Sequence, residues 1–173
     1  SIAISNGLNN NMINNILSIS PHITITNNGY YIEDYESIMA KLEKISGVKG
    51  AIPTFSNQGI LKTDNEEGSF SSGVKIQGMD LKKATQAMSL SKIMMAGKIE
   101  PEEYNKVLIG SELYDQFGLK VGDKVELTSA ENKKVMLVVG GAFKSGSLDI
   151  DSSMVILPLV TAQLISESGD VLR

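Results

Sequence analysis

Few side chains in this sequence have the types and spacing that catalysis or metal binding requires. The chain has one histidine, His22, and no cysteine. A histidine-based zinc site needs further His or Cys ligands, and a cysteine nucleophile needs a thiol, so the sequence excludes both. Because His22 stands beside Pro21 and ahead of an alternating apolar stretch, we interpret it as a structural hydrogen-bonding residue.

Acidic side chains gather at two places in the sequence. Asp149 and Asp151 are two residues apart, and Asp64, Glu66 and Glu67 lie close together upstream. Paired carboxylates can bind Ca²⁺ or perform acid–base catalysis. The residues after Asp151 lack the Asp or Asn and the Gly of an EF-hand loop. We therefore interpret the Asp149–Asp151 segment as a solvated turn.

The glycine pattern contains neither a phosphate-binding loop nor a nucleophile elbow. Glycines 140, 141 and 146 do not have the spacing of a phosphate cradle, and Gly146-Ser147 is not part of a Gly-x-Ser-x-Gly sequence. The formal charge of −4 has no long run of one sign, which argues against a nucleic-acid partner. We therefore predict a chain that is not an enzyme, has no cofactor and no metal, and depends on another polypeptide for any ATPase activity.

Helical and strand patterns alternate along the chain, and one helix has the full set of end signals. Apolar residues at 35, 38, 39, 42 and 45 share a helical face, acidic residues come first, lysines come late, and Gly47 follows. This order suits the helix dipole and a glycine C-cap. The other expected helices are 8–17, one or two within 82–95, a first turn at 101–103, 111–117 with Ser111 as N-cap, and 159–165. The expected strands are 23–26, 48–55, 60–63, 74–77, 106–109, 124–128, 135–143 and 154–157, with a turn at 56–59 and an exposed hairpin tip or mobile loop at 64–73.

Three methionines, Met88, Met94 and Met95, fall in the segment where one or two short helices are expected. Flexible thioether side chains can form an adaptable surface for a lipid or a protein partner, but they more often fill gaps in a core. We favour the core for these three and keep the surface as an alternative.

Several short motifs follow one another in an order that is typical of one protein family. They are VLIGSEL at 107–113, FGLKVGDKVEL at 117–127, VVGGAF at 138–143, DSSMVILPL at 151–159 and AQ at 162–163, with NGL at 6–8, SPHI at 20–23 and VKIQGMD at 74–80 upstream. Together they resemble the extracytoplasmic domain of ABC-transporter permeases of the MacB/FtsX type, and in particular LolC/LolE permeases that release lipoproteins. The resemblance extends over nearly the whole chain.

The resemblance implies an α+β fold, the MacB-like periplasmic core, in which an α/β lobe is interrupted by a strand-rich second lobe. Residues 1–21 would form a membrane-proximal helix. Residues 22–77 and 151–173 would form the α/β, porter-like lobe, which we expect to continue beyond Arg173. Residues 78–150 would form the inserted, strand-rich, sabre-like lobe.

The resemblance also implies a function in transport. The chain would be the periplasmic domain of an inner-membrane permease that transmits ATP-driven motion of the membrane helices to export or release of a substrate. The implied partners are an ATPase subunit acting through transmembrane helices, a second permease subunit in a homo- or heterodimer, and a lipoprotein or other hydrophobic substrate. The alternative is a free-standing small-barrel binding or regulatory domain that uses the Gly122-Asp123 turn.

One departure from the LolC-like pattern concerns the connection between strands 124–128 and 135–143. LolC-like permeases have a long protruding loop there, which engages a periplasmic lipoprotein carrier. Here the connection is short and polar. Its residues Glu131, Asn132, Lys133 and Lys134 are the candidate partner contact, and carrier docking of the LolC type is not expected.

Overall fold

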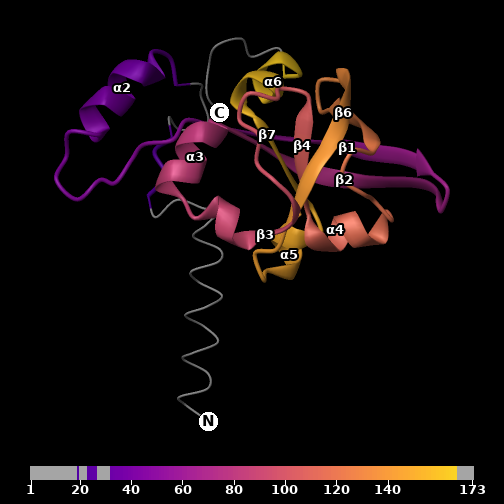
Figure 1. The fold of residues 1–173 in the computed structure, drawn as a ribbon. Helices are drawn as coiled ribbons and strands as arrows, with labels where there is room; N and C mark the ends of the chain where they lie inside the picture. Colours follow the sequence, from indigo (N-terminus) through magenta and orange to yellow (C-terminus); the bar gives the residue numbers. More distant parts are fainter. Residues whose placement is uncertain (1–18, 20–22, 27–31, 167–173) are drawn as a thin grey trace.

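The computed structural model describes residues 19, 23–26 and 32–166. This part of the chain is built around one mixed sheet of seven strands in the order β3-β6-β4-β7-β2-β1-β5. Figure 1 shows the sheet together with the helices beside it. The strands are β1 (Thr54–Asn65), β2 (Gly68–Met79), β3 (Met94–Gly97), β4 (Lys106–Gly110), β5 (Lys124–Ser129), β6 (Lys134–Phe143) and β7 (Met154–Pro158). The helices are α2 (Tyr35–Leu42), α3 (Leu81–Ala87), the 3₁₀ helix η1 (Leu90–Ile93), α4 (Ser111–Gln116), α5 (Leu148–Asp151) and α6 (Leu159–Leu164). This mixture confirms the α+β class.

The sheet closes into a barrel because β6 holds two strands along one edge. Residues 134–138 of β6 pair with β5, residues 141–143 pair with β3, and β4 pairs along the opposite edge. Since β5 also pairs with β1, every strand except β3 belongs to a closed ring. Closure removes the free edges that an open sheet would expose to other chains.

Strands β1 and β2 form a hairpin that is paired over its whole length. The turn expected at 56–59 is therefore wrong, because β1 is continuous there. The exposed hairpin tip expected within 64–73 is confirmed, but it occupies only the residues between β1 and β2, and the rest of that segment is strand. Polar residues and glycines suggested turns, but pairing with β2 keeps these segments extended, and from Gly59 to Lys62 β1 pairs with β5 as well. Gly59 fits because a Cβ there would overlap the carbonyl oxygen of Thr128.

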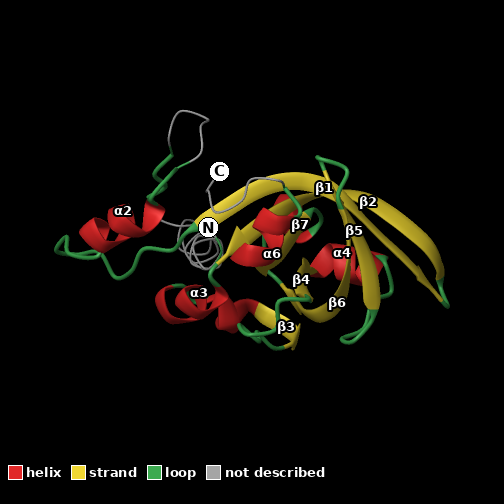
Figure 2. Cartoon of the chain, turned by 90° about the horizontal axis from the view of Figure 1, so that it is seen from above, coloured by secondary structure: helices red, strands yellow, loops and turns green. Residues whose placement is uncertain are grey.

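The interior of the barrel is the larger of the two apolar cores found in the described part of the chain. Every ring strand contributes side chains to it, and so do α4 and α6, which lie within the curve of the strands (Figure 2). The ring of Phe70 on β2 stacks on Phe117 at the end of α4, with 5.4 Å between the ring centroids. Aromatic stacking adds to area burial, so this pair secures the far part of the hairpin to the barrel.

A second core lies on the outer side of the barrel, under α3 and η1. Leu108 of β4 and Ile156 of β7 are buried here, and Met88 and Met94 pack against them. The interpretation of the methionines as core residues is confirmed for these two. Met95, in contrast, is 56% exposed.

Helix α2 stands apart from the barrel in both views (Figures 1 and 2). The helix predicted from residue 35 is confirmed, although it ends at Leu42 instead of 45, and none of its residues is buried. It begins after Asp34, whose backbone is left-handed with φ 52°. The amphipathic pattern thus predicted a helix correctly but did not show what its apolar face would contact.

The strand expected at 23–26 is wrong. These residues have no strand structure, and Ile23 and Ile25 are 80% and 50% exposed. Alternation of apolar and polar residues makes a strand only when a second strand accepts its backbone hydrogen bonds, and the described residues offer none here. For the same reason the strand expected from 48 begins only at Thr54. The helix expected at 8–17 lies outside the described residues.

Two expectations about helix starts are also corrected. Residues 101–103 form a turn that leads directly back into β4. The N-cap of α4 is Gly110, while Ser111 is already helical and its buried Oγ has no hydrogen-bond partner among the described residues. The short connection from β4 into α4 places the cap one residue earlier than the serine pattern suggested.

The two lobes expected from the sequence contribute strands to the same sheet. Strands β1, β2 and β7 come from 22–77 and 151–173, and β3 to β6 come from 78–150. The β1–β5 and β4–β7 pairs cross between these segments. The inserted segment leaves from β2 and returns at β7, which are parallel neighbours. The division into lobes remains a prediction.

Candidate functional site

The predicted partner contact lies in the turn between β5 and β6. The backbone closes there through Ser129, whose N–H donates to the Lys133 carbonyl at 2.8 Å. Asn132 has a left-handed backbone with φ 62°, a conformation that asparagine tolerates better than most residues. The turn is also anchored to β1, because the Ala130 N–H donates to the Gln58 carbonyl at 2.9 Å.

The side chains of this turn contact neighbouring strands. The Asn57 side-chain amide of β1 donates to Glu131 Oε2 at 2.8 Å. Lys134 Nζ lies 3.8 Å from Glu126 Oε1 on β5. The turn is thus a compact continuation of the barrel wall, and its role as a partner contact stays a prediction.

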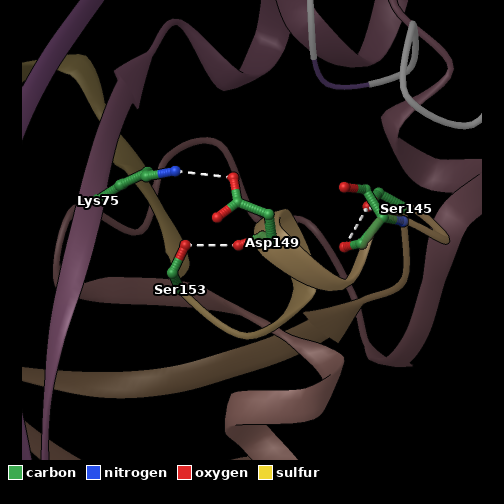
Figure 3. A network of polar contacts seen from close by, with 5 residues as sticks. Lys75, Ser145, Asp149 and Ser153 are labelled. Atoms are coloured by element: carbon green, nitrogen blue, oxygen red, sulfur yellow. Dashed lines mark hydrogen bonds and ion pairs between the residues drawn. The ribbon is translucent and has the colours of Figure 1, made fainter.

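The structure gives Asp149 and Asp151 different surroundings. Figure 3 labels Asp149 together with its partners Lys75 and Ser153. Asp149 is exposed and pairs with Lys75 Nζ at 2.8 Å, while its carbonyl accepts a hydrogen bond from Ser153 Oγ at 2.5 Å. Asp151 is buried, and its carboxylate accepts bonds from Ser145 N and Oγ, both at 2.7 Å, and from Gly146 N at 3.0 Å. The interpretation as a solvated turn is therefore wrong for Asp151, because α5 turns its carboxylate inward to hold the loop that follows β6.

The upstream acidic residues also have separate structural roles. Asp64 accepts a hydrogen bond from Ser69 Oγ across the β1–β2 hairpin. The Glu67 carboxylate lies over Gly118, where a Cβ would overlap it. Within the described residues, no group of three or more His, Cys, Asp or Glu side chains is placed to hold a metal ion. His22 lies outside those residues.

A cleft of about 590 Å³ separates α2 from one end of the barrel. Its floor includes the buried side chains of Met79, Leu81 and Leu159. Its walls come from α2, from the residue before β1, from the start of α3, from the loop that precedes β4 and from the start of α6. Sequence reasoning missed this cleft because its walls come from segments that are far apart in the chain.

The loop that precedes β4 carries the main charge cluster near this cleft. Lys106 Nζ and Lys98 Nζ both contact the Glu100 carboxylate, the latter at 3.3 Å. Hydrogen bonds from Lys106 and then Lys98 hold the pKa of Glu100 below its usual value, and the bond to Glu100 raises the pKa of Lys106. On α4, burial raises the pKa of the Tyr114 hydroxyl.

The barrel and its helices match the fold of a solved transporter domain. The structural likeness covers 90% of this chain and 72% of the extracellular domain of the noncanonic ABC-type transporter YknZ from Gram-positive bacteria. The TM-score is 0.56 and the sequence identity 13%. The fold is therefore of the class found in the extracellular domains of ABC-type transporters.

The chain belongs to the MacB-like periplasmic core domain family, which matches residues 1–172. It is 23% identical to the lipoprotein-releasing system transmembrane protein LolC of Xylella fastidiosa over 98% of this chain, and 23% identical to LolC of Neisseria meningitidis serogroup B over 95%. The chain spans 43% and 41% of the lengths of these two relatives. The family predicted from the motifs is thereby confirmed. Within the described residues, no helix is both long and apolar enough to cross a membrane.

Proposed function

We propose that this chain is the periplasmic domain of an inner-membrane ABC-transporter permease. In this proposal it transmits ATP-driven motion of the membrane helices to the export or release of a substrate. Membership of the MacB-like family supports the assignment to a permease. The similarity to LolC, a protein of the lipoprotein-releasing system, makes lipoproteins the first substrate to test.

The observation that carries the mechanical part of the proposal is the closure of the sheet. A ring of hydrogen-bonded strands around a packed interior resists deformation, because bending it would break pairing and packing together. Strands β1, β5 and β6 complete that ring. A domain of this kind moves as one body when the helices attached to it move, which is what transmission of force requires.

The partners follow from this role. An ATPase subunit acts on the domain through transmembrane helices, and a second permease subunit completes a homo- or heterodimer. The substrate is a lipoprotein or another hydrophobic molecule. The domain itself hydrolyses no nucleotide and binds no nucleic acid.

Docking of a carrier at the β5–β6 turn is not part of the proposal. The turn is short and polar and its backbone is tied to β1, whereas a specific interface usually buries about 800 Å² per partner. The alternative of a free-standing barrel domain shares the observed barrel, but the family match over residues 1–172 favours a permease domain.

The cellular location can be tested with thiol labelling, since the chain has no native cysteine. Ser71→Cys places a thiol on the exposed side of β2, and Val139→Cys places one in the barrel interior. In cells with a permeabilised outer membrane and an intact inner membrane, we expect a membrane-impermeant maleimide to label Ser71→Cys, and to label Val139→Cys only after denaturation. Labelling of Ser71→Cys only after lysis of the inner membrane would contradict the periplasmic location.

A further inference from the structure

The cleft beneath α2 carries more acidic than basic side chains. Among the described residues, the charged lining consists of Glu36, Glu43, Asp80, Glu102, Lys82 and Lys83. Four carboxylates and two ammonium groups leave the lining with an excess of negative charge at neutral pH. An occupant with positive charge would therefore be favoured over a neutral or acidic one.

Part of this lining is already engaged within the protein. Lys83 Nζ lies 3.6 Å from Glu43 Oε1, and the Asp80 carboxylate accepts a hydrogen bond from the Lys83 backbone N–H at 3.0 Å. Among the charged residues of the lining, Lys82 alone is left to balance Glu36 and Glu102. These two carboxylates come from α2 and from the loop before β4, so they flank the cleft from different elements.

The rest of the lining is apolar and adaptable. Met79 and Leu159 form part of the floor, and Met39 of α2 lies opposite. Tyr104 and Val160 extend the apolar surface to the rim, where they are 55% and 51% exposed. Methionine side chains adjust to differently shaped partners, and proteins use them at surfaces that bind varied apolar groups.

We propose that this cleft binds a cationic amphipathic peptide. Its apolar side chains contact Met39, Tyr104 and Val160, above the buried floor that includes Met79 and Leu159. Its lysine or arginine side chains face Glu36 and Glu102. The volume of about 590 Å³ accommodates a few side chains, and it lies within the range of about 300–1,000 Å³ typical of ligand sites. No residue of α2 is fully buried, and Tyr35 at its start is the residue of this helix that packs against the barrel core. This site stands independently of the transport function proposed above.

The methionine methyl groups provide a direct test in the 173-residue chain, which has 8 methionines. With ¹³C-methyl labelling, a peptide of about 12 residues, roughly three helical turns of leucine and lysine, is titrated in parallel with a leucine–glutamate peptide of equal length. We expect the lysine peptide to shift the Met39 and Met79 signals. Met95 and Met136, which are exposed elsewhere, should not move.

Two double variants test whether the carboxylates of the cleft, and not acidic residues elsewhere, favour the cationic peptide. Glu36→Gln with Glu102→Gln removes two charges from the cleft, and Glu112→Gln with Asp115→Asn removes two exposed charges from α4. We expect the first pair to weaken binding of the lysine peptide by about fivefold or more at low salt, and the second pair to leave it nearly unchanged.

Three results would overturn the proposal. The first is that the lysine peptide does not shift Met39 and Met79, or that the glutamate peptide shifts them equally. The second is that the α4 pair weakens binding as much as the cleft pair. The third is that phosphatidylcholine vesicles shift these signals while the lysine peptide does not, which would identify a lipid site instead.

Discussion

Ala162 of α6 occupies the space that a side chain at Gly78 of β2 would need. Both residues are buried, and Gly78 lies beside Phe55 of β1 at the end of the hairpin. The helix can therefore approach the strands closely only because position 78 lacks a Cβ. This contact joins the end of β2 to the helix that follows β7.

Replacing Gly78 by alanine should consequently destabilise the domain. Overpacking of a tight core contact costs about 1–3 kcal/mol, and we expect Gly78→Ala to lower the free energy of unfolding by that amount. Gly73→Ala is the matched control, because it lies on the same strand with open space around its Cα. Urea unfolding of both variants gives the comparison, and equal stabilities would contradict the tight packing of α6.

Asp151 should be important for stability, and its neighbour Asp149 should not. Asp151→Ala leaves two backbone N–H groups and the Ser145 hydroxyl without their buried acceptor, and an unsatisfied buried polar group costs about 1–3 kcal/mol. The exposed pair of Asp149 with Lys75 is worth about 0–1 kcal/mol. Chemical unfolding should give a much lower free energy of unfolding for Asp151→Ala than for Asp149→Ala. The reverse order would show that the carboxylate does not hold the 144–147 loop.

The Glu100 cluster should make thermal stability depend on pH. Hydrogen bonds from Lys106 and Lys98 lower the pKa of Glu100 in the folded state. The ionised Glu100 carboxylate therefore contributes to the stability of the fold above its unfolded pKa of about 4.3. This contribution is lost as the pH falls through the folded pKa. The raised pKa of Lys106 keeps that side chain charged throughout this range. The difference in Tm between the unmodified chain and Glu100→Gln should thus shrink between about pH 6 and pH 3. A difference that stays constant would contradict this explanation.

Removing the charges of the β5–β6 turn should have little effect on transport. We expect Glu131→Ala, Lys133→Ala and Lys134→Ala together to leave substrate release by the intact permease nearly unchanged. Glu131 contacts Asn57 and Lys134 contacts Glu126, both on adjacent strands of the barrel. A release assay on membranes with matched permease levels measures the effect. A loss of about tenfold, or about 1.4 kcal/mol of barrier, with folding intact would show that the turn is a docking element.

The sequence predicted well those elements whose signals are local. Strand β4, the β5–β6 hairpin and helix α6 have strong apolar patterns and turn residues at their ends, and the structure confirms them. Strand β1 was predicted poorly, because Asn57 and Gly59 have turn-like character. Pairing of both residues with β2, and of Gly59 also with the distant strand β5, decides their conformation instead.

The candidate sites also depend on long-range contacts that local sequence patterns do not reveal. The spacing of Asp149 and Asp151 was visible, but only the fold of α5 shows that one carboxylate is buried and the other exposed. The cleft beneath α2 joins Met39 to Leu159 across more than half of the chain. No local pattern connects two such residues, so the cleft could not be predicted from the sequence.

The central claim, that the domain transmits motion as one body, is tested most directly by loosening its attachment. Flexible Gly/Ser linkers of about ten residues, inserted in the intact permease where the periplasmic domain joins each membrane helix, would let the domain move independently of those helices. The measurement is ATP hydrolysis and substrate release by the same reconstituted permease. We predict that hydrolysis continues while release falls to background. Release that continues at the unmodified rate through flexible linkers would contradict the account.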